Sequence, residues 1–262
     1  MRARVLDVRG GAAEEALLEA SRVLRQGGLV VFPTETVYGL GANALDARAV
    51  LKIFEAKGRP PDNPLIVHVA EISEAGRVAF LSDTARKLMH RFWPGPLTLV
   101  LPARGNVPAE VTANLSTVAV RMPAQPVAME LIRLAEVPVA APSANLSGRP
   151  SPTDAEAATE DLGEKVDIIL DGGPTRVGVE STVLDVTGDR SVLLRPGGIS
   201  IEMLEGFLGY RPLLPGGEEG IARRSPGTRY RHYAPRIPLL LREDESVWGK
   251  VERWEPEYRA YV

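Results

Sequence analysis

The chain has 262 residues, of which 44% are hydrophobic and 25% are charged, and its net charge is −3. This composition is that of an ordinary globular protein and excludes a disordered, collagen-like or disulfide-stapled chain. The absence of cysteine also excludes a zinc–thiolate site and a thiol nucleophile.

The N-terminal half alternates between expected helices and strands. Apolar residues recur at helical spacing over residues 13–26, and Gly27 and Gly28 follow as a stop signal. A second helix is expected to begin after Asp46 and a third after Ser82, because both residue types cap helix N-termini. Buried strands are predicted at residues 29–32, 65–69 and 97–101, and a polar loop at residues 34–41.

The second half adds more strands, several of which follow one another directly. Further strands are predicted at residues 118–122, 137–141, 166–170, 182–186 and 192–194. Helices are expected near residues 126–135, after the capping-box sequence Thr153–Glu156, and over residues 200–207. The fold class is therefore α/β, with a twisted, mixed parallel and antiparallel open sheet flanked by helices.

The composition changes after this region. Residues 209–236 are rich in glycine, proline and arginine, which is typical of an extended linker. Residues 237–262 are too few to form a core of their own. We therefore expect a catalytic domain over 1–208, a linker over 209–236 and a short C-terminal segment over 237–262.

The common catalytic motifs are missing from the sequence. It contains no P-loop, no dinucleotide fingerprint and no nucleophile elbow, and its three histidines lack metal-ligand spacing. The chemistry is expected instead in polar loops that follow strands, where open α/β sheets bind ligands.

Cations at the ends of expected elements suggest a cleft that binds anions. Arg121 interrupts one apolar strand and Arg195 ends another, and a guanidinium there needs a partner, either a bound carboxylate or phosphate or an internal acid. Lys57 continues the apolar stripe of its helix, so its ammonium either points into a cleft or complements the helix dipole. The turn Ser143–Gly148 offers hydroxyl and amide donors to a ligand, or is an ordinary turn. His68, between two valines, fits a structural histidine on pattern alone.

Several ordered motifs together strongly resemble the YrdC-like threonylcarbamoyl-AMP synthase family. They are Pro33–Leu40, Lys57–Arg59, Asn63–Leu65, Phe92–Thr98, Ser143–Gly148, Glu180–Val183 and Leu194–Gly197. The similarity runs from about Ala13 to Ser200, and Ser225–Pro235 resembles the active-site-covering linker of the two-domain members. Those members continue into a further C-terminal domain, whereas only residues 237–262 follow the linker here, so that domain is either reduced or truncated.

The resemblance implies a nucleotidyltransferase. Such enzymes join L-threonine, bicarbonate and ATP into L-threonylcarbamoyl-adenylate, with release of pyrophosphate and water. ATP is a substrate accompanied by Mg²⁺, and no metal is expected on protein side chains. Other proteins then transfer the threonylcarbamoyl group to a tRNA adenosine beside the anticodon, while direct contact of this chain with tRNA stays open.

The resemblance also assigns roles to individual residues. The family's K-x-R and S-x-N signatures, expected to be catalytic, fall on Lys57, Arg59, Ser143 and Asn145. Residues expected to bind L-threonine are Thr36, His68, Arg121 and Ser181. Residues expected to contact ATP are Arg59, Asn63, Thr117, Ser143, Asn145, Ser151, Arg195 and the linker tyrosines Tyr230 and Tyr233.

Two rival functions were weighed. An RNA-binding module of the same fold, without ATP turnover, would use the arginines of residues 223–236, although the net charge of −3 disfavours strong nonspecific binding. The carbamoyl-handling domain of hydrogenase maturation factors is disfavoured because those proteins carry cysteine zinc fingers. No run approaches the roughly 18 apolar residues of a membrane span, and the first residues lack a signal-peptide core. We therefore expect a cytoplasmic enzyme.

Overall fold

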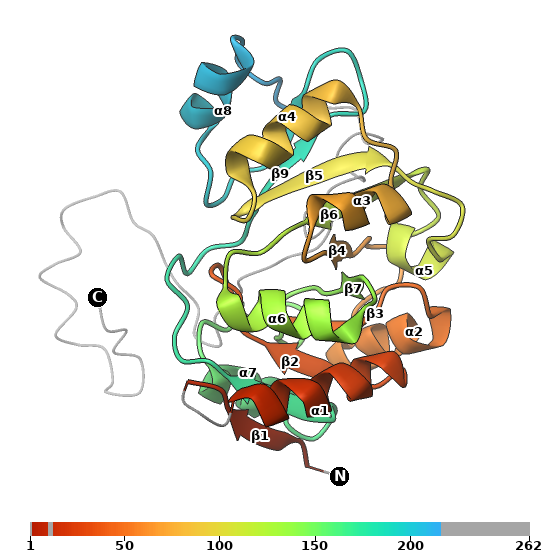
Figure 1. Ribbon diagram of the computed structural model, residues 1–262, viewed down its shortest axis with the longest axis vertical. Coiled ribbons are helices and arrows are strands. Elements are labelled where there is room, and N and C mark those ends of the chain that lie inside the picture. The colour runs from red at the N-terminus through yellow and green to blue at the C-terminus, as the bar shows by residue number, and fades with distance from the viewer. Residues whose placement is uncertain (1, 10–12, 216–262) are drawn as a thin grey trace, which may run out of the picture.

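A computed structural model describes residues 2–9 and 13–215, which form a twisted sheet with helices packed on both faces (Figure 1). Within these ranges the strands are β1 Arg4–Asp7, β2 Val30–Phe32, β3 Gly39–Asn43, β4 Ile66–His68, β5 Leu97–Pro102, β6 Thr117–Arg121, β7 Val139–Ala140, β8 Ile168–Asp171, β9 Thr182–Asp185 and β10 Val192–Arg195. The helices are α1 Ala13–Arg25, α2 Ala47–Lys57, α3 Ile72–Val78, α4 Asp83–Phe92, α5 Ala109–Thr112, α6 Pro126–Ala135, α7 Ala155–Leu162 and α8 Ile201–Leu208.

The sheet mixes parallel and antiparallel pairs, as the sequence predicts. Its strands lie in the order β1-β8-β2-β3-β7-β4-β6-β5-β9-β10. Strand β8 runs parallel to β1 and β2, and the pairs β4–β6 and β5–β9 are also parallel. The pairs β2–β3, β3–β7, β4–β7, β5–β6 and β9–β10 are antiparallel. The fold class is therefore confirmed.

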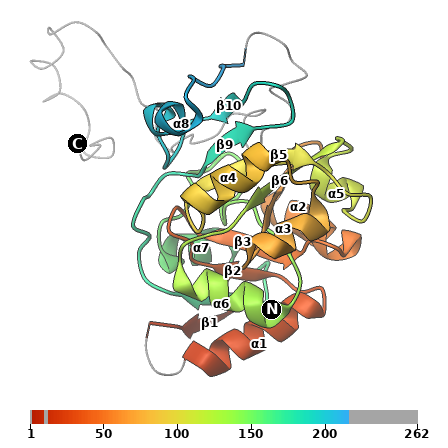
Figure 2. The same cartoon turned by 45° about the horizontal axis from the view of Figure 1, so that its top comes forward.

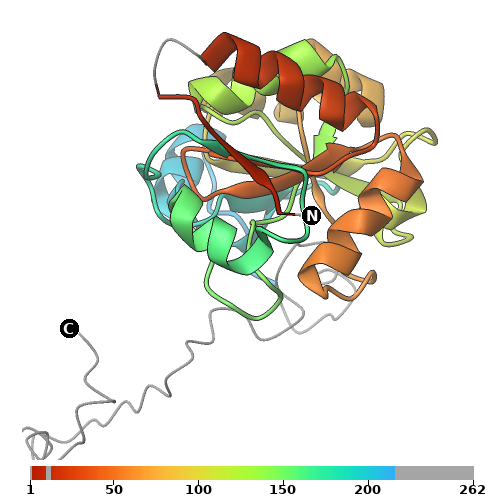
Figure 3. The ribbon, with the colours of Figure 1, turned by 90° about the horizontal axis from the view of Figure 1, so that it is seen from below.

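The alternation of side chains along β2 shows how the two helical layers are held. Helices α1 and α6 lie side by side on one face, and α2 and α7 lie on the other (Figure 3). Val30 and Phe32 pack into the hydrophobic cluster of α1 and α6, whereas Val31 packs into the cluster that includes α2. All three side chains are completely buried. Neither face of this strand contacts solvent, so its residues need not alternate between apolar and polar, and residues 30–32 form a continuous apolar run.

Local capping signals place several helix ends as expected. The Asp46 side chain accepts hydrogen bonds from the backbone N–H groups of Arg48 and Ala49, and α2 ends at Gly58, whose φ of 60° is left-handed. The Ser82 side chain caps α4 in the same way, as predicted. At α7 the capping residue is Asp154 and not the expected Thr153, because the Asp154 carboxylate accepts the N–H of Ala157 at 2.8 Å.

Four elements were not expected from the sequence. They are β1, β3, α3 and α5. Strand β3 includes residues 39–41, which were expected to belong to a loop. A Cβ at Gly41 would lie 2.8 Å from Cε1 of Phe32, so the glycine lets β3 pair closely beside the Phe32 ring.

The far end of the sheet carries α8, which lies close to β9 and β10 (Figure 2). Phe207 of α8 packs edge-on against Phe92 of α4, with ring centroids 5.5 Å apart. Leu213 then forms a β-bridge with Val192, so the chain follows the outer strand until the described residues end. None of the helices in the described ranges has both the length and the apolar character needed to cross a lipid bilayer.

Candidate functional site

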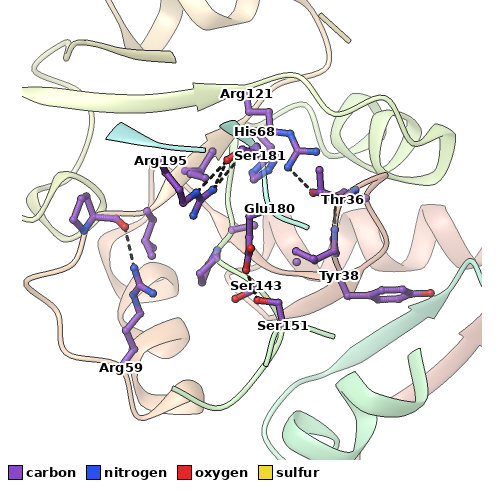
Figure 4. A pocket seen from close by; sticks show the side chains of 18 residues that line it. Thr36, Tyr38, Arg59, His68, Arg121, Ser143, Ser151, Glu180, Ser181 and Arg195 are labelled. Carbon is purple, nitrogen blue, oxygen red and sulfur yellow. Dashed lines mark hydrogen bonds between the residues drawn. The ribbon is translucent and has the colours of Figure 1, made fainter. Parts of the chain in front are cut away.

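Loops from both halves of the chain converge on one cavity (Figure 4). The loop between β2 and β3, the segment after α2, the end of β6, the turn after β7 and the residues on either side of the β9–β10 hairpin all line it. Its empty volume is about 640 Å³ when the open mouth is included. The cavity therefore lies where strand ends meet, as expected for an open α/β sheet.

The loop after β2 forms one wall of the cavity and is held by its own hydroxyl groups. Thr34 Oγ1 donates to the carbonyl of Val37 at 2.6 Å and lies 2.8 Å from Thr36 Oγ1. Tyr38 is completely buried and donates from its hydroxyl to the carbonyl of Gly173 at 2.7 Å. Burial raises the pKa of Tyr38, so its phenol stays neutral and anchors this loop to the strand end of β8.

Arg121 ends β6 in the same wall and is held by two other segments, the loop after β2 and the turn before β5. Its Nη1 donates to Thr36 Oγ1 at 3.0 Å and its Nε donates to the carbonyl of Gly95 at 3.3 Å. Its Nη2 lies 2.7 Å from Oε1 of Glu35, and both side chains of this ion pair are almost completely buried. The guanidinium thus has an internal acidic partner, which was one of the two alternatives left open by the sequence.

His68 stands beside Arg121, because the two residues face each other in the β4–β6 register. Burial, reinforced by the Arg121 charge, lowers the pKa of His68 to about 3. The imidazole is therefore neutral at physiological pH. Its Nδ1 is buried and has no hydrogen-bond partner among the described residues.

Ser181 and Arg195 connect the outer hairpin to this wall. Arg195 Nη2 donates to the carbonyl of Ser181 at 2.9 Å and to Ser181 Oγ at 3.2 Å, and its Nε donates to the same carbonyl at 3.1 Å. Ser181 Oγ also lies 2.7 Å from Thr98 Oγ1 on β5. These contacts fix a cationic group at the cavity next to a hydroxyl.

The opposite side of the cavity is built on the end of α2 and the turn after β7. Lys57 is buried, and its Nζ donates to the carbonyl of Ser143 at 2.6 Å, to the carbonyl of Asn145, and to Asn145 Oδ1 at 3.5 Å. Ser143 Oγ donates to the same Oδ1 at 2.5 Å. Burial, with a smaller contribution from the Arg59 charge, holds the pKa of Lys57 well below its usual range. Lys57 therefore clamps the turn that presents Ser143, and does not itself line the cavity.

Arg59 reaches the cavity just beyond the left-handed Gly58. Its Nη2 donates to the carbonyls of Pro64 at 3.1 Å and Asn63 at 3.4 Å. Figure 4 shows Arg59 across the cavity from Arg121 and Thr36. The two guanidinium groups therefore flank a shared space from separate elements.

The cavity brings together most of the residues singled out from the sequence. Those that line it are Thr36, Arg59, His68, Arg121, Ser143, Ser151, Ser181 and Arg195. Those that do not line it are Lys57, Asn63, Thr117 and Asn145. Thr117 begins β6, at the opposite end of the strand from Arg121. Tyr230 and Tyr233 lie outside the described residues.

Two acidic residues at the site were missed by the sequence analysis. Glu35 pairs with Arg121, and Glu180 lines the cavity and accepts a 2.6 Å hydrogen bond from Ser151 Oγ. Glu35 directly precedes Thr36 and Glu180 directly precedes Ser181, two residues that were predicted. No sequence pattern distinguishes either acid from an ordinary solvent-exposed acid in a loop. Within residues 2–9 and 13–215, no group of three or more histidine or acidic side chains could hold a metal ion.

Family models match nearly the whole chain. The Sua5/YciO/YrdC model, described as telomere recombination, matches residues 22–197. The model of the C-terminal domain of threonylcarbamoyl-AMP synthase matches residues 199–260.

Individual relatives agree with these matches. The threonylcarbamoyl-AMP synthase of Pyrococcus abyssi is 51% identical over 253 residues, which are 95% of this chain and 74% of that relative. The Bacillus subtilis protein of the same name is 52% identical over 230 residues, 87% of this chain and 66% of its own length. The crystal structure of P. abyssi Sua5 complexed with L-threonine matches with a TM-score of 0.85 and 52% identity, covering 89% of this chain and 69% of that one.

Proposed function

Since the chain belongs to the Sua5/YciO/YrdC family and its relatives are threonylcarbamoyl-AMP synthases, we propose that its cavity joins L-threonine, bicarbonate and ATP into L-threonylcarbamoyl-adenylate, releasing pyrophosphate and water. One observation carries the proposal. Arg59, Arg121 and Arg195 come from distant parts of the sequence and line one cavity together with the hydroxyls of serine and threonine. Such a set suits three anionic groups: a carboxylate, a carbamate and a triphosphate.

L-Threonine is assigned to the wall formed by Thr36, His68, Arg121 and Ser181. The fork of Arg121 matches the substrate carboxylate through two parallel hydrogen bonds. The neutral His68 beside it adds no second positive charge. The relative crystallised with L-threonine supports this choice of substrate.

ATP is assigned to the side formed by Arg59, Ser143, Ser151 and Arg195. The α-phosphorus would then lie between the two walls, where the carbamate made from threonine and bicarbonate attacks it. Lys57 and Asn145 contribute through the turn that carries Ser143, and Asn63 through its carbonyl contact with Arg59. Thr117 and the linker tyrosines Tyr230 and Tyr233 keep their assignment to ATP as proposals.

The chemistry needs positioning and charge neutralisation more than a protein nucleophile. The threonine amine attacks bicarbonate, water leaves, and a carbamate remains. A carbamate oxygen then attacks the α-phosphorus, and pyrophosphate departs toward Arg59 and Arg195. Mg²⁺ is proposed to arrive with ATP, held mainly by phosphates and water, because Glu180 is the only carboxylate among the described residues that line the cavity.

The wider setting follows from the product. A reactive adenylate must pass to other proteins, which we propose transfer the threonylcarbamoyl group to a tRNA adenosine beside the anticodon. We also propose that the chain acts in the cytoplasm, with residues 209–236 as a lid over the cavity.

A pyrophosphate-release assay with ATP and bicarbonate tests the function directly. Release is expected only when L-threonine is added, together with formation of a threonylcarbamoyl-adenylate detectable by mass spectrometry. Equal release without L-threonine would contradict the proposal. Tight, steeply salt-dependent RNA binding without any turnover would support the RNA-binding alternative, which the relatives do not favour.

A further inference from the structure

Glu35 is a buried acid whose partner is a substrate-site residue. Its side chain is 3% exposed, and Oε1 lies 2.7 Å from Nη2 of Arg121, which is 4% exposed. Its other oxygen, Oε2, accepts the backbone N–H of Ala124 at 3.0 Å. The carboxylate is therefore fixed against the segment that follows β6, and it faces the guanidinium from a defined side.

The contacts of Arg121 with the described residues do not use all of its N–H donors. Nε and Nη1 have acceptors in Gly95 and Thr36, but Nη2 and Glu35 Oε1 make no hydrogen bond of normal geometry despite their short separation. A guanidinium has five N–H donors, so Arg121 retains donors for an incoming group. Because Glu35 opposes one side of the guanidinium, the remaining donors are held in one orientation.

Glu35 also ties this arrangement to a second loop of the cavity. Its carbonyl accepts the N–H of Val177 at 2.9 Å, and the carbonyl of Thr36 accepts the N–H of Gly178 at 3.0 Å. The loop that leads to Ser181 is thus attached to the residue that holds Arg121.

We propose that Glu35 is a positioning residue for substrate recognition: it neutralises Arg121 and fixes the plane of its guanidinium so that the remaining N–H donors receive the carboxylate of L-threonine. This inference rests on the proposed function, in which Arg121 binds that carboxylate. Bidentate recognition depends on the angle of the guanidinium plane as well as on its charge. Glu35 does not touch the substrate.

The test measures L-threonine binding by calorimetry and the KM values for L-threonine and ATP on the full chain. Glu35→Gln is expected to weaken L-threonine binding about tenfold, while ATP binding changes less than about twofold. Glu35→Asp keeps the charge and is expected to restore part of the affinity. Glu55→Gln is the matched control, since Glu55 is exposed on α2 and lies outside the cavity.

A double-mutant cycle asks whether Glu35 acts through Arg121. On an Arg121→Ala background, Glu35→Gln is expected to change the L-threonine affinity by less than about twofold, because the group that it positions is gone. Factors that multiply in the double variant would overturn the proposal. Tighter L-threonine binding in Glu35→Gln would also overturn it. Equal losses of affinity for L-threonine and ATP, together with a lower kcat and a lower melting temperature, would overturn it too.

Two outcomes separate this inference from the function on which it rests. If the wild-type chain neither binds L-threonine nor releases pyrophosphate, the proposed function fails. If the wild type does both and Glu35→Gln matches it, only the role of Glu35 fails. Should the glutamine variant not fold with an unpaired guanidinium in its core, Glu35→Asp decides, and an unchanged L-threonine affinity in that variant overturns the proposal.

Discussion

The neutral state of His68 predicts a specific acid sensitivity of the fold. Burial beside Arg121 lowers the pKa of His68 from the usual 6.5 to about 3. Below pH 6.5 the unfolded chain binds a proton at this residue that the folded chain does not bind. The free energy of unfolding therefore falls as the pH falls from about 7 toward 3.

The size of the effect follows from the two pKa values. A pH of 5 is about 1.5 units below the usual histidine pKa of 6.5, and each unit corresponds to about 1.4 kcal/mol. His68 alone therefore lowers the free energy of unfolding at pH 5 by about 2 kcal/mol relative to pH 7. His68→Gln removes the titrating group and this part of the pH dependence. Urea unfolding of both proteins at pH 7 and pH 5 measures it, since carboxylates shared by both cancel in the comparison.

His90→Gln, a histidine exposed on α4, serves as the control for removing an imidazole. Wild type and His90→Gln should lose about 2 kcal/mol more than His68→Gln between the two pH values. If all three proteins lose the same amount, His68 is not held neutral by burial, and the reasoning about its role beside Arg121 is wrong.

Three further predictions concern the cavity and its frame. Lys57→Met removes the donor to three oxygens of the turn after β7, so it should lower the free energy of unfolding in urea by about 2 kcal/mol and reduce pyrophosphate release. Arg59→Ala should reduce pyrophosphate release without that loss of stability. Arg121→Ala should raise the KM for L-threonine far more than the KM for ATP, and an unchanged value would remove Arg121 from the substrate site. Gly197→Ala should lower the free energy of unfolding by about 2 kcal/mol or more, because a Cβ there would lie 2.3 Å from a backbone oxygen. Gly206→Ala is the control and should be tolerated, because a Cβ at Gly206 has no atom within 4 Å. Equal stability of the two variants would contradict this packing.

Local signals in the sequence were sufficient for much of the fold. Asp46 and Ser82 cap their helices through contacts only two or three residues away. The apolar run at residues 30–32 predicts a buried strand by its composition alone. Strand β3 was missed because its pairing depends on the fit of Gly41 against Phe32, which no spacing rule reports. The cap at Asp154 was misplaced by one residue because Thr153 and Asp154 are both good capping residues.

At the site, too, local sequence patterns predicted some features, whereas others depend on the tertiary fold. The sequence indicated Arg121 and Lys57 as unusual cations, because each stands in an apolar pattern. It did not indicate which acceptors they meet, since Glu35 and the turn at Ser143 are brought to them only by the tertiary fold. Lys57 holds a turn through its ammonium, and the local pattern alone does not distinguish that contact from one with a ligand.

The position of β8 has a consequence for synthesis on the ribosome. This strand lies between β1 and β2 in the sheet, although it follows both of them by well over half of the described chain. While translation proceeds from the N-terminus, the two early strands emerge with their inner edges lacking the neighbour that later separates them. Unpaired strand edges favour pairing with other chains, and neither early strand can complete its native pairing until residue 171 has left the exit tunnel.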